Sequence, residues 1–258
     1  DVADWFWVPS WKRSFLPPSG KGKKPARSCV LLFMDECGLG KRIFRELRSS
    51  GQEVIRLYHG KTFAVKGENS WVVNPGRLAD YKAFSKELEK EKILPDKIVH
   101  LWNVTEDKKT SSSFSLKRAE YFQKLGFFSL LYIAQSMGKI NIPGEIHLYV
   151  VSNNLQDVDS TEELMPEKAP LLGPVKVIPQ EYPNVKTCNL DVQFKHDSAA
   201  DLKRVTEQIM AEIRSDIPEV IVAYRKSHRW TQCYERIHLG KHLRKRFSPR
   251  KGGVYLIT

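Results

Sequence analysis

The sequence predicts an α/β protein in which helices cover both faces of a mostly parallel sheet. Six short apolar runs alternate with stretches of helical periodicity, which is the order that parallel strands joined by crossover helices require. The first run, Cys29–Met34, is apolar at every position, which is typical of a strand buried on both faces. Of the 258 residues, 41% are hydrophobic, enough for the core of one large domain or two small ones.

Local patterns then mark each element in order. Gly38 and Gly40 turn the chain from the first strand into a helix that ends at Gly51. Asp80 is expected to cap a later helix, and residues 63–73 predict a hairpin around a polar turn. The expected strands cover residues 29–34, 53–58, 97–102, 146–151, 186–190 and 220–224, and the expected helices cover 40–51, 80–92, 122–138, 171–177 and 202–213. No internal repeat of solenoid length is present.

The two flanks of the chain differ from this alternating body. The segment Trp5–Trp11 is dense in aromatic residues and predicts a strand-like arm, and Pro17–Pro25 is a loop by composition. After Arg225 the alternation stops, and Gly252–Thr258 has the pattern of a further buried strand. We therefore divide the chain into an aromatic strand and basic linker (1–27), an α/β body (28–225), and a basic linker with a last strand (226–258).

The net charge of +12 is confined to these flanks. Residues 28–225 hold 27 Lys and Arg against 27 Asp and Glu, whereas 12–27 carry six cations and no acid, and 226–252 carry nine cations against Glu235 alone. Nucleic-acid-binding domains usually spread a basic stripe over a folded face. We therefore expect solvated flanks and no nucleic-acid partner.

Composition also bears on the compartment. Four cysteines without a CxxC pair give neither a disulfide framework nor a zinc-ribbon spacing. Asp1–Trp5 does not have the pattern of a signal peptide, and the richest apolar stretch, 127–134, is far shorter than the roughly 20 residues that cross a bilayer. The sequence predicts a soluble, reducing, cytoplasmic setting without a membrane partner.

The first strand-to-helix turn is where a dinucleotide would bind in such a sheet. Gly38 and Gly40 match the start of a glycine-rich phosphate loop, but Ile43 stands at the third glycine position. Asp35 and Glu36 place two carboxylates beside the expected anion site. We expect a tight helix turn here, with no cofactor bound by this chain.

A reductive acid–base pair is also missing. A tyrosine that delivers a proton needs a lysine four residues later, but Leu172 occupies the position four before Lys176. Ser152, at a strand end, has the position of a catalytic serine, although serine is common there. His238 and His242 have the i, i+4 spacing of metal ligands but no third ligand, so we expect no metal.

Three segments together resemble the structural subdomain of a modular polyketide synthase ketoreductase. They are the opening Trp5–Lys12, the segment Leu171–Pro183 and the closing Gly253–Thr258. In that family a fold like that of short-chain dehydrogenases occurs twice, first as a truncated, inert copy and then as a copy that binds NADPH. The sequence of residues 171–183 resembles that of synthases from assembly lines with free-standing acyltransferases.

The resemblance implies a truncated Rossmann-like fold and a non-catalytic role. It implies partners as well: the catalytic subdomain that reduces carrier-bound β-ketoacyl thioesters with NADPH, the acyl carrier protein and other synthase domains. The closing strand would belong to the catalytic subdomain. We expect the interface with that subdomain to consist of apolar side chains at both ends of the chain, namely Trp5, Trp7, Trp11, Val254, Tyr255, Leu256 and Ile257.

Two other functions stay open. An autonomous NAD(P)-dependent short-chain reductase would bind NADPH and turn over a β-ketothioester by itself. A basic module that binds a carrier protein or nucleic acid would lose affinity steeply with salt, through residues 226–252.

Overall fold

The computed structural model describes residues 4–16, 28–106, 115–140, 144–215, 219–238 and 250–256. The chain forms two compact units. We call Arg13–Thr231 the body, and Asp1–Lys12 together with Gln232–Thr258 the arm. The domain boundaries after residues 27 and 225 stay a prediction.

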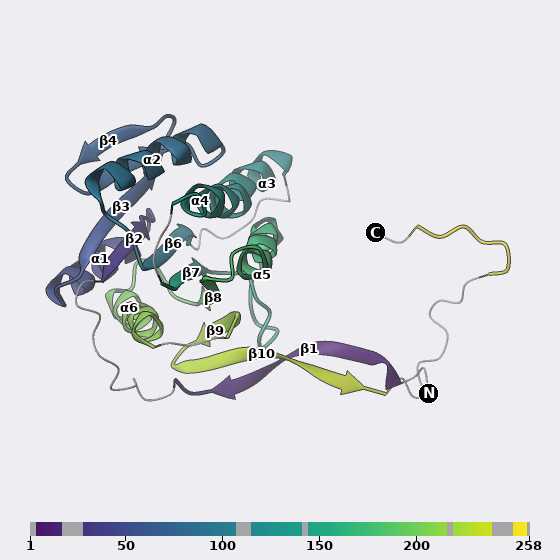
Figure 1. The fold of residues 1–258 in the computed structure, drawn as a ribbon. Helices are drawn as coiled ribbons and strands as arrows, with labels where there is room; N and C mark the ends of the chain where they lie inside the picture. The colour runs from purple at the N-terminus through teal and green to yellow at the C-terminus, as the bar shows by residue number, and fades with distance from the viewer. Residues whose placement is uncertain are drawn as a thin grey trace. The chain divides into compact units, whose positions relative to one another are not determined.

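The chain has the predicted α/β sheet, which confirms the fold class (Figure 1). Within the described residues the sheet has ten strands in the order β1-β10-β9-β8-β7-β6-β2-β3-β5-β4. The central strands are mutually parallel, β4 is antiparallel to β5, and β10 is antiparallel to β9 through His228–Thr231. The strands are β1 (Phe6–Ser14), β2 (Cys29–Phe33), β3 (Glu53–His59), β4 (Ala64–Gly67), β5 (Ser70–Val73), β6 (Lys97–Asn103), β7 (Ile146–Ser152), β8 (Val185–Val192), β9 (Ile221–Arg225) and β10 (His228–Ile237).

Helices pack on both faces of the sheet (Figure 1). One face is covered by α1 (Leu39–Ser49) and α6 (Ala199–Arg214), and the other by α2 (Leu78–Glu91), α3 (Leu116–Gln123), α4 (Ser129–Met137) and α5 (Leu172–Glu181). The first face encloses a hydrophobic core cluster, to which α1 contributes Leu39, Ile43 and Leu47. On α6 the buried residues recur at i, i+4 and i+8, the spacing of one helix face. Burying this apolar face against the sheet stabilises both helices.

Two helices differ from the prediction. The long helix expected over 122–138 is interrupted by a π-helical turn, Lys124–Phe128, between α3 and α4. There Gly126 lies against Asn103 so closely that a Cβ atom would be 3.0 Å from Asn103 Oδ1. The helix expected at 171–177 is preceded by a 3-10 turn, Pro166–Leu171, and continues to Glu181.

Two smaller predictions need correction. Asp80 does not cap its helix, because α2 begins at Leu78, and the Asp80 carboxylate instead accepts a hydrogen bond from the Asn74 amide at 2.9 Å. The strand expected at the end of the chain does not form over residues 250–256, where Val254 is 98% exposed and Leu256 89%. An apolar run becomes a strand only when its N–H and C=O groups pair with a neighbouring strand. Ile257 lies outside the described residues.

Candidate functional site

The turn from β2 to α1 is closed by a side chain of the protein itself. The Asp35 carboxylate accepts hydrogen bonds from the amides of Leu39, at 3.1 Å, and Gly40, at 2.5 Å. Gly38 takes a left-handed conformation (φ 88°), which glycine adopts without strain. A Cβ atom on Gly40 would lie 2.8 Å from Asp35 Oδ1. Both glycines therefore let the carboxylate reach the start of the helix.

This arrangement does not fit a dinucleotide. The free amides at a helix N-terminus are what binds a phosphate in nucleotide folds, and here Asp35 satisfies two of them. Burial raises the pKa of Asp35, while the hydrogen bonds from Gly40 and Leu39 oppose the rise. A pyrophosphate would have to displace this carboxylate and approach Glu36 next to it. The sequence indicated the unfavourable charge but not that Asp35 occupies the position of the anion.

A crevice of about 240 Å³ lies beside this turn, at the carboxyl ends of β2, β3 and β6. Ligands bind at this edge in open α/β sheets, where the strand order reverses. The walls of the crevice include His59 and Trp102. The Nε2 atom of His59 lies 3.5 Å from Glu36 Oε1. Burial lowers the pKa of His59, with Glu36 acting against this. The lining residues are Asp35, Glu36, Cys37, His59, Trp102, Val104, Thr105, Glu106, Tyr121 and Leu125.

Cys37, at the helix start, is not an activated nucleophile. Burial, followed by the Asp35 carboxylate, raises the pKa of its thiol to about 12. Its Sγ lies 3.6 Å from the Val104 carbonyl oxygen. A thiolate nucleophile needs the opposite environment, with cations or an unoccupied helix N-terminus nearby.

Ser152 belongs to a buried hydrogen-bond network. Its hydroxyl donates to Asp191 Oδ1 at 2.9 Å and receives a hydrogen bond from Asn189 Nδ2 at 3.1 Å. Lys176 is exposed on α5, and Leu172 is half-buried at the start of that helix. Of the three positions that the sequence offered for reductive chemistry, Ser152 is engaged in this buried network and Leu172 carries no proton donor.

Arg225 organises the polar groups around Asp191. Its Nη2 donates to Asp191 Oδ2 at 2.9 Å and to the Gln156 carbonyl at 2.6 Å, and its Nε pairs with Glu162 Oε1 at 2.7 Å. All three charged side chains are buried. The network fixes the loop after β7 against the ends of β8 and β9. Our sequence reasoning missed it, although a carboxylate and a guanidinium at the ends of two successive apolar strands were a usable signal.

Lys168 is a second buried charge that the sequence did not reveal. It is 1% exposed. Its ammonium donates to Thr105 Oγ1 at 2.9 Å, to the Asn153 carbonyl at 2.9 Å and to Asn153 Oδ1 at 2.7 Å. Three acceptors satisfy all three of its protons. The amine holds two loops together and lies near Cys37, whose pKa it lowers slightly against the larger effect of burial.

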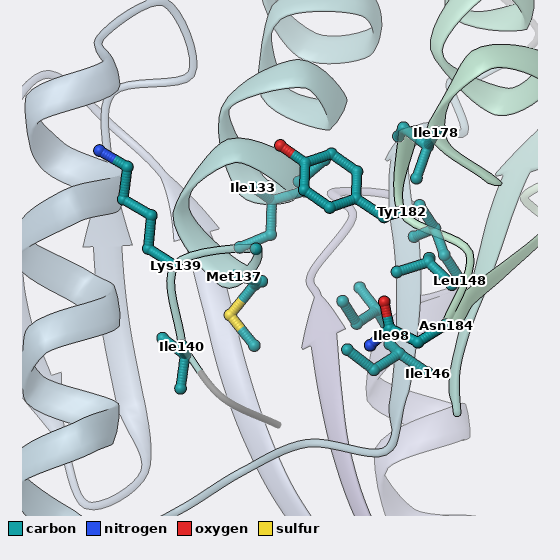
Figure 2. A pocket seen from close by; sticks show the side chains of 13 residues that line it. Ile98, Ile133, Met137, Lys139, Ile140, Ile146, Leu148, Ile178, Tyr182 and Asn184 are labelled. Carbon is teal, nitrogen blue, oxygen red and sulfur yellow. The ribbon is translucent and has the colours of Figure 1, made fainter. Parts of the chain in front are cut away.

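An apolar cavity of about 340 Å³ lies at the opposite, amino ends of the strands. Figure 2 shows Met137 and Tyr182 beside it, with Ile98 and Ile146 on the strand side. The Tyr182 ring packs directly on Gly138, where any side chain would overlap with it. Glycine at position 138 therefore allows the Tyr182 ring to lie against the chain at the wall of the cavity.

The arm carries the aromatic residues expected at an interface. Trp5 is 74% and Trp7 60% exposed, whereas Trp11 is half-buried. Tyr255 is also exposed, and its hydroxyl accepts a hydrogen bond from the Arg250 amide at 2.7 Å. Whether these residues form the predicted interface stays a prediction.

Of the histidine pair in the arm, the structure describes only His238. His238 Nδ1 lies 2.8 Å from Asp4 Oδ1, and His242 lies outside the described residues. Residues 4–16, 28–106, 115–140, 144–215, 219–238 and 250–256 contain no group of three His, Cys, Asp or Glu side chains placed to hold a metal.

The fold defines the class of protein, a Rossmann-like α/β domain similar to ketoreductases and short-chain dehydrogenases. One similar structure is a multidomain adenylation, ketoreductase and pseudo Asub structure of a keto acid-selecting NRPS module (TM-score 0.79, 22% identity, 90% of this chain and 18% of that chain). Another is an N-terminal ketoreductase from the macrolactin assembly line (TM-score 0.72, 16% identity, 95% and 46%). A short-chain dehydrogenase/reductase from Serratia marcescens also matches (TM-score 0.57, 9% identity, 79% and 99%).

A family match covers most of the sequence. Residues 29–212 match the family described as Beta-ketoacyl synthase-like, N-terminal, and the chain belongs to that family. No curated protein matches the chain. The chain spans less than half of the length of the two ketoreductase-containing chains. Among the described helices, none has the length and apolar character needed to cross a membrane.

Proposed function

We propose that this chain is the non-catalytic structural subdomain of a polyketide synthase ketoreductase. In this role it stabilises and positions a catalytic subdomain that reduces carrier-bound β-ketoacyl thioesters to β-hydroxyacyl thioesters with NADPH. The observation that carries the proposal is the Asp35 carboxylate at the start of α1, because it satisfies the amides that a cofactor phosphate needs.

Three of the four cysteines, Cys29, Cys37 and Cys188, support a role without chemistry, even though the family description names a synthase. Acyl transfer to a cysteine requires a thiolate. Burial raises the pKa of Cys29 and of Cys37 to about 12, and it raises the pKa of Cys188 well above its ordinary value. These three thiols are therefore protonated at neutral pH.

The exposed aromatic residues of the arm support a docking role. Two tryptophans with most of their surface in water are unfavourable unless a partner covers them, because an aromatic ring buries about 150–250 Å². We infer that Trp5, Trp7 and Trp11, with Val254–Ile257, contact the catalytic subdomain. The other partners would be the acyl carrier protein and neighbouring synthase domains, in the cytoplasm, in an assembly line with free-standing acyltransferases.

The first test is an NADPH titration of the isolated chain, in which binding is measured by tryptophan fluorescence and by calorimetry. The expected result is no saturable binding, because Asp35 and Glu36 repel the pyrophosphate. Saturable binding, or turnover of a β-ketothioester by the chain alone, would favour the autonomous reductase instead.

The second test addresses docking. The chain is mixed with a ketoreductase catalytic subdomain, and the affinity is compared for wild type, the Trp5→Ser/Trp7→Ser variant and a Val65→Ser control. Val65 is 64% exposed on β4, in the body, so it controls for the loss of an exposed apolar side chain. The proposal expects weaker binding only for the tryptophan variant. Equal affinity of all three proteins would contradict the docking role but not the absence of cofactor binding.

A further inference from the structure

A groove runs between α1 and α6 on one face of the sheet. It has a volume of about 270 Å³ and is lined by Arg42, Arg45, Glu46, Lys203, Thr206, Glu207, Met210 and Arg214. Figure 1 shows the two helices side by side on the same face of the sheet. Thr206, Met210 and Arg214 follow one another at i, i+4 and i+8, so they form one line along α6. The groove therefore extends along α6, between the two helices.

The lining of this groove is predominantly basic, unlike the electrically neutral body around it. Four cations, Arg42, Arg45, Lys203 and Arg214, face two carboxylates, Glu46 and Glu207. Lys41 and Arg48 are further exposed cations on α1. This excess lies in the folded body, apart from the basic flanks that dominate the net charge of the chain.

The cations of the groove are not used inside the protein. Among the described residues, the side chains of Arg42, Arg45 and Arg214 make no hydrogen bond, ion pair or ring contact. The ion pair of Lys203 with Glu207 is long, at 3.9 Å, and both side chains are exposed. Arginine elsewhere in this chain is used for buried structure, as Arg225 and Arg229 show. The guanidinium groups of the groove are thus available to an outside ligand.

The helices that carry these cations are firmly anchored. Leu39, Ile43 and Leu47 of α1 are fully buried, and so are Val205, Ile209 and Ile213 of α6. A ligand would meet a preformed arrangement of charges and would not have to order the backbone, which reduces the entropy lost on binding. Met210 and Thr206, both buried, also line the groove, and Met210 gives it an apolar side chain.

We propose that the groove between α1 and α6 binds the acidic face of an amphipathic helix from a partner protein. Carboxylates on that helix would contact Arg42, Arg45 and Arg214, and an apolar side chain between them would cover Met210. A nucleic-acid backbone fits less well. Its charge is uniformly negative, and Glu46 and Glu207 in the lining of the groove would repel its phosphates. The inference does not depend on the proposed function.

The test uses the full chain and a fluorescein-labelled helical peptide with glutamates at i, i+4 spacing and a leucine on the same face. Fluorescence anisotropy gives its Kd for wild type, for Arg45→Glu/Arg214→Glu, and for a Lys82→Glu/Lys86→Glu control. Lys82 and Lys86 are exposed on α2, on the opposite face of the sheet, so the control has the same change of net charge away from the groove. Thermal unfolding of each variant checks that the fold is kept.

The expected result is a Kd raised roughly tenfold for the groove variant only, because two attractions each become repulsions. A peptide with lysines in place of glutamates should then bind the groove variant more tightly than it binds wild type. No binding of the glutamate peptide to wild type, or an equal loss in the α2 control, would overturn the proposal. So would labelled single-stranded DNA that binds wild type more tightly than the peptide and loses affinity only in the groove variant.

Discussion

Replacing Asp191 by asparagine should destabilise the body strongly while leaving its shape unchanged. Asp191 is fully buried and accepts hydrogen bonds from Ser152 Oγ and Arg225 Nη2, both at 2.9 Å, and from the amides of Leu155 and Gln156, both at 3.2 Å. Asparagine fills the same volume but carries no charge, and it presents an N–H₂ group to one of these donors. The variant therefore removes one of the two carboxylate partners of a buried guanidinium.

The loss in free energy of unfolding depends on the interactions that Arg225 keeps in the variant. Breaking a buried ion pair by removing one partner costs about 3–5 kcal/mol. Arg225 keeps its contact with Glu162 at 2.7 Å, so we expect a loss near the lower end, about 3 kcal/mol. For a domain of this size the melting temperature should fall by roughly 6–12 °C. Ser152→Ala removes one hydrogen bond to a charged acceptor and should cost about 1.5 kcal/mol.

The assay is urea unfolding followed by circular dichroism, with Asp201→Asn as the matched control. Asp201 pairs with Arg204 at 2.8 Å, nearly the same distance, but the two side chains are 30% and 28% exposed. An exposed pair of this kind contributes less than about 1 kcal/mol. If the two asparagine variants lose the same free energy of unfolding, burial does not decide the strength of these pairs and our reasoning about Arg225 fails.

Two further predictions concern pH and packing. Burial raises the pKa of Glu162, but hydrogen bonds from Arg225 and the Val158 amide outweigh it and hold that pKa at about 2, below the ordinary 4.5. Wild type should therefore be more stable than Glu162→Gln above pH 4.5, and the difference should disappear as the pH falls toward 2 in unfolding measurements across the acid range; a constant difference would contradict the ion pair. Gly138→Ala should cost roughly 1–3 kcal/mol in the same assay, because its Cβ overlaps the Tyr182 ring. In the control Gly173→Ala the nearest atom is 3.7 Å away, so no loss is expected, and equal losses would argue against the overlap.

Local sequence patterns were sufficient for the order and type of the elements. The run Cys29–Phe33 is buried at every position, and Ile43 and Leu47 lie on the buried face of α1, as their spacing indicated. Periodicity reports how each segment alternates between core and solvent, and that depends only on neighbouring residues. The sequence likewise showed that the first turn lacks the third glycine of a phosphate loop.

Contacts between distant segments were beyond such patterns. Arg225 reaches Glu162 across 63 positions of sequence, and no periodicity specifies which charge meets which. The strand predicted at the end of the chain does not form over residues 250–256 for a related reason. A strand is stabilised by pairing with a neighbouring strand, and Val254 and Leu256 have no such neighbour in the described residues.

The sequence by itself determined the alternating α/β body, its neutral charge between basic flanks, and the presence of Ile43 and Leu172 where a glycine and a tyrosine were sought. Only the tertiary structure decided that the Asp35 carboxylate occupies the start of α1, and that unpaired cations from α1 and α6 line one groove. The physical reason is that hydrogen bonds and charge interactions depend on distances in space. Those distances are fixed when the helices pack on the sheet. The pattern of buried and exposed residues, in contrast, follows from the local sequence of each segment.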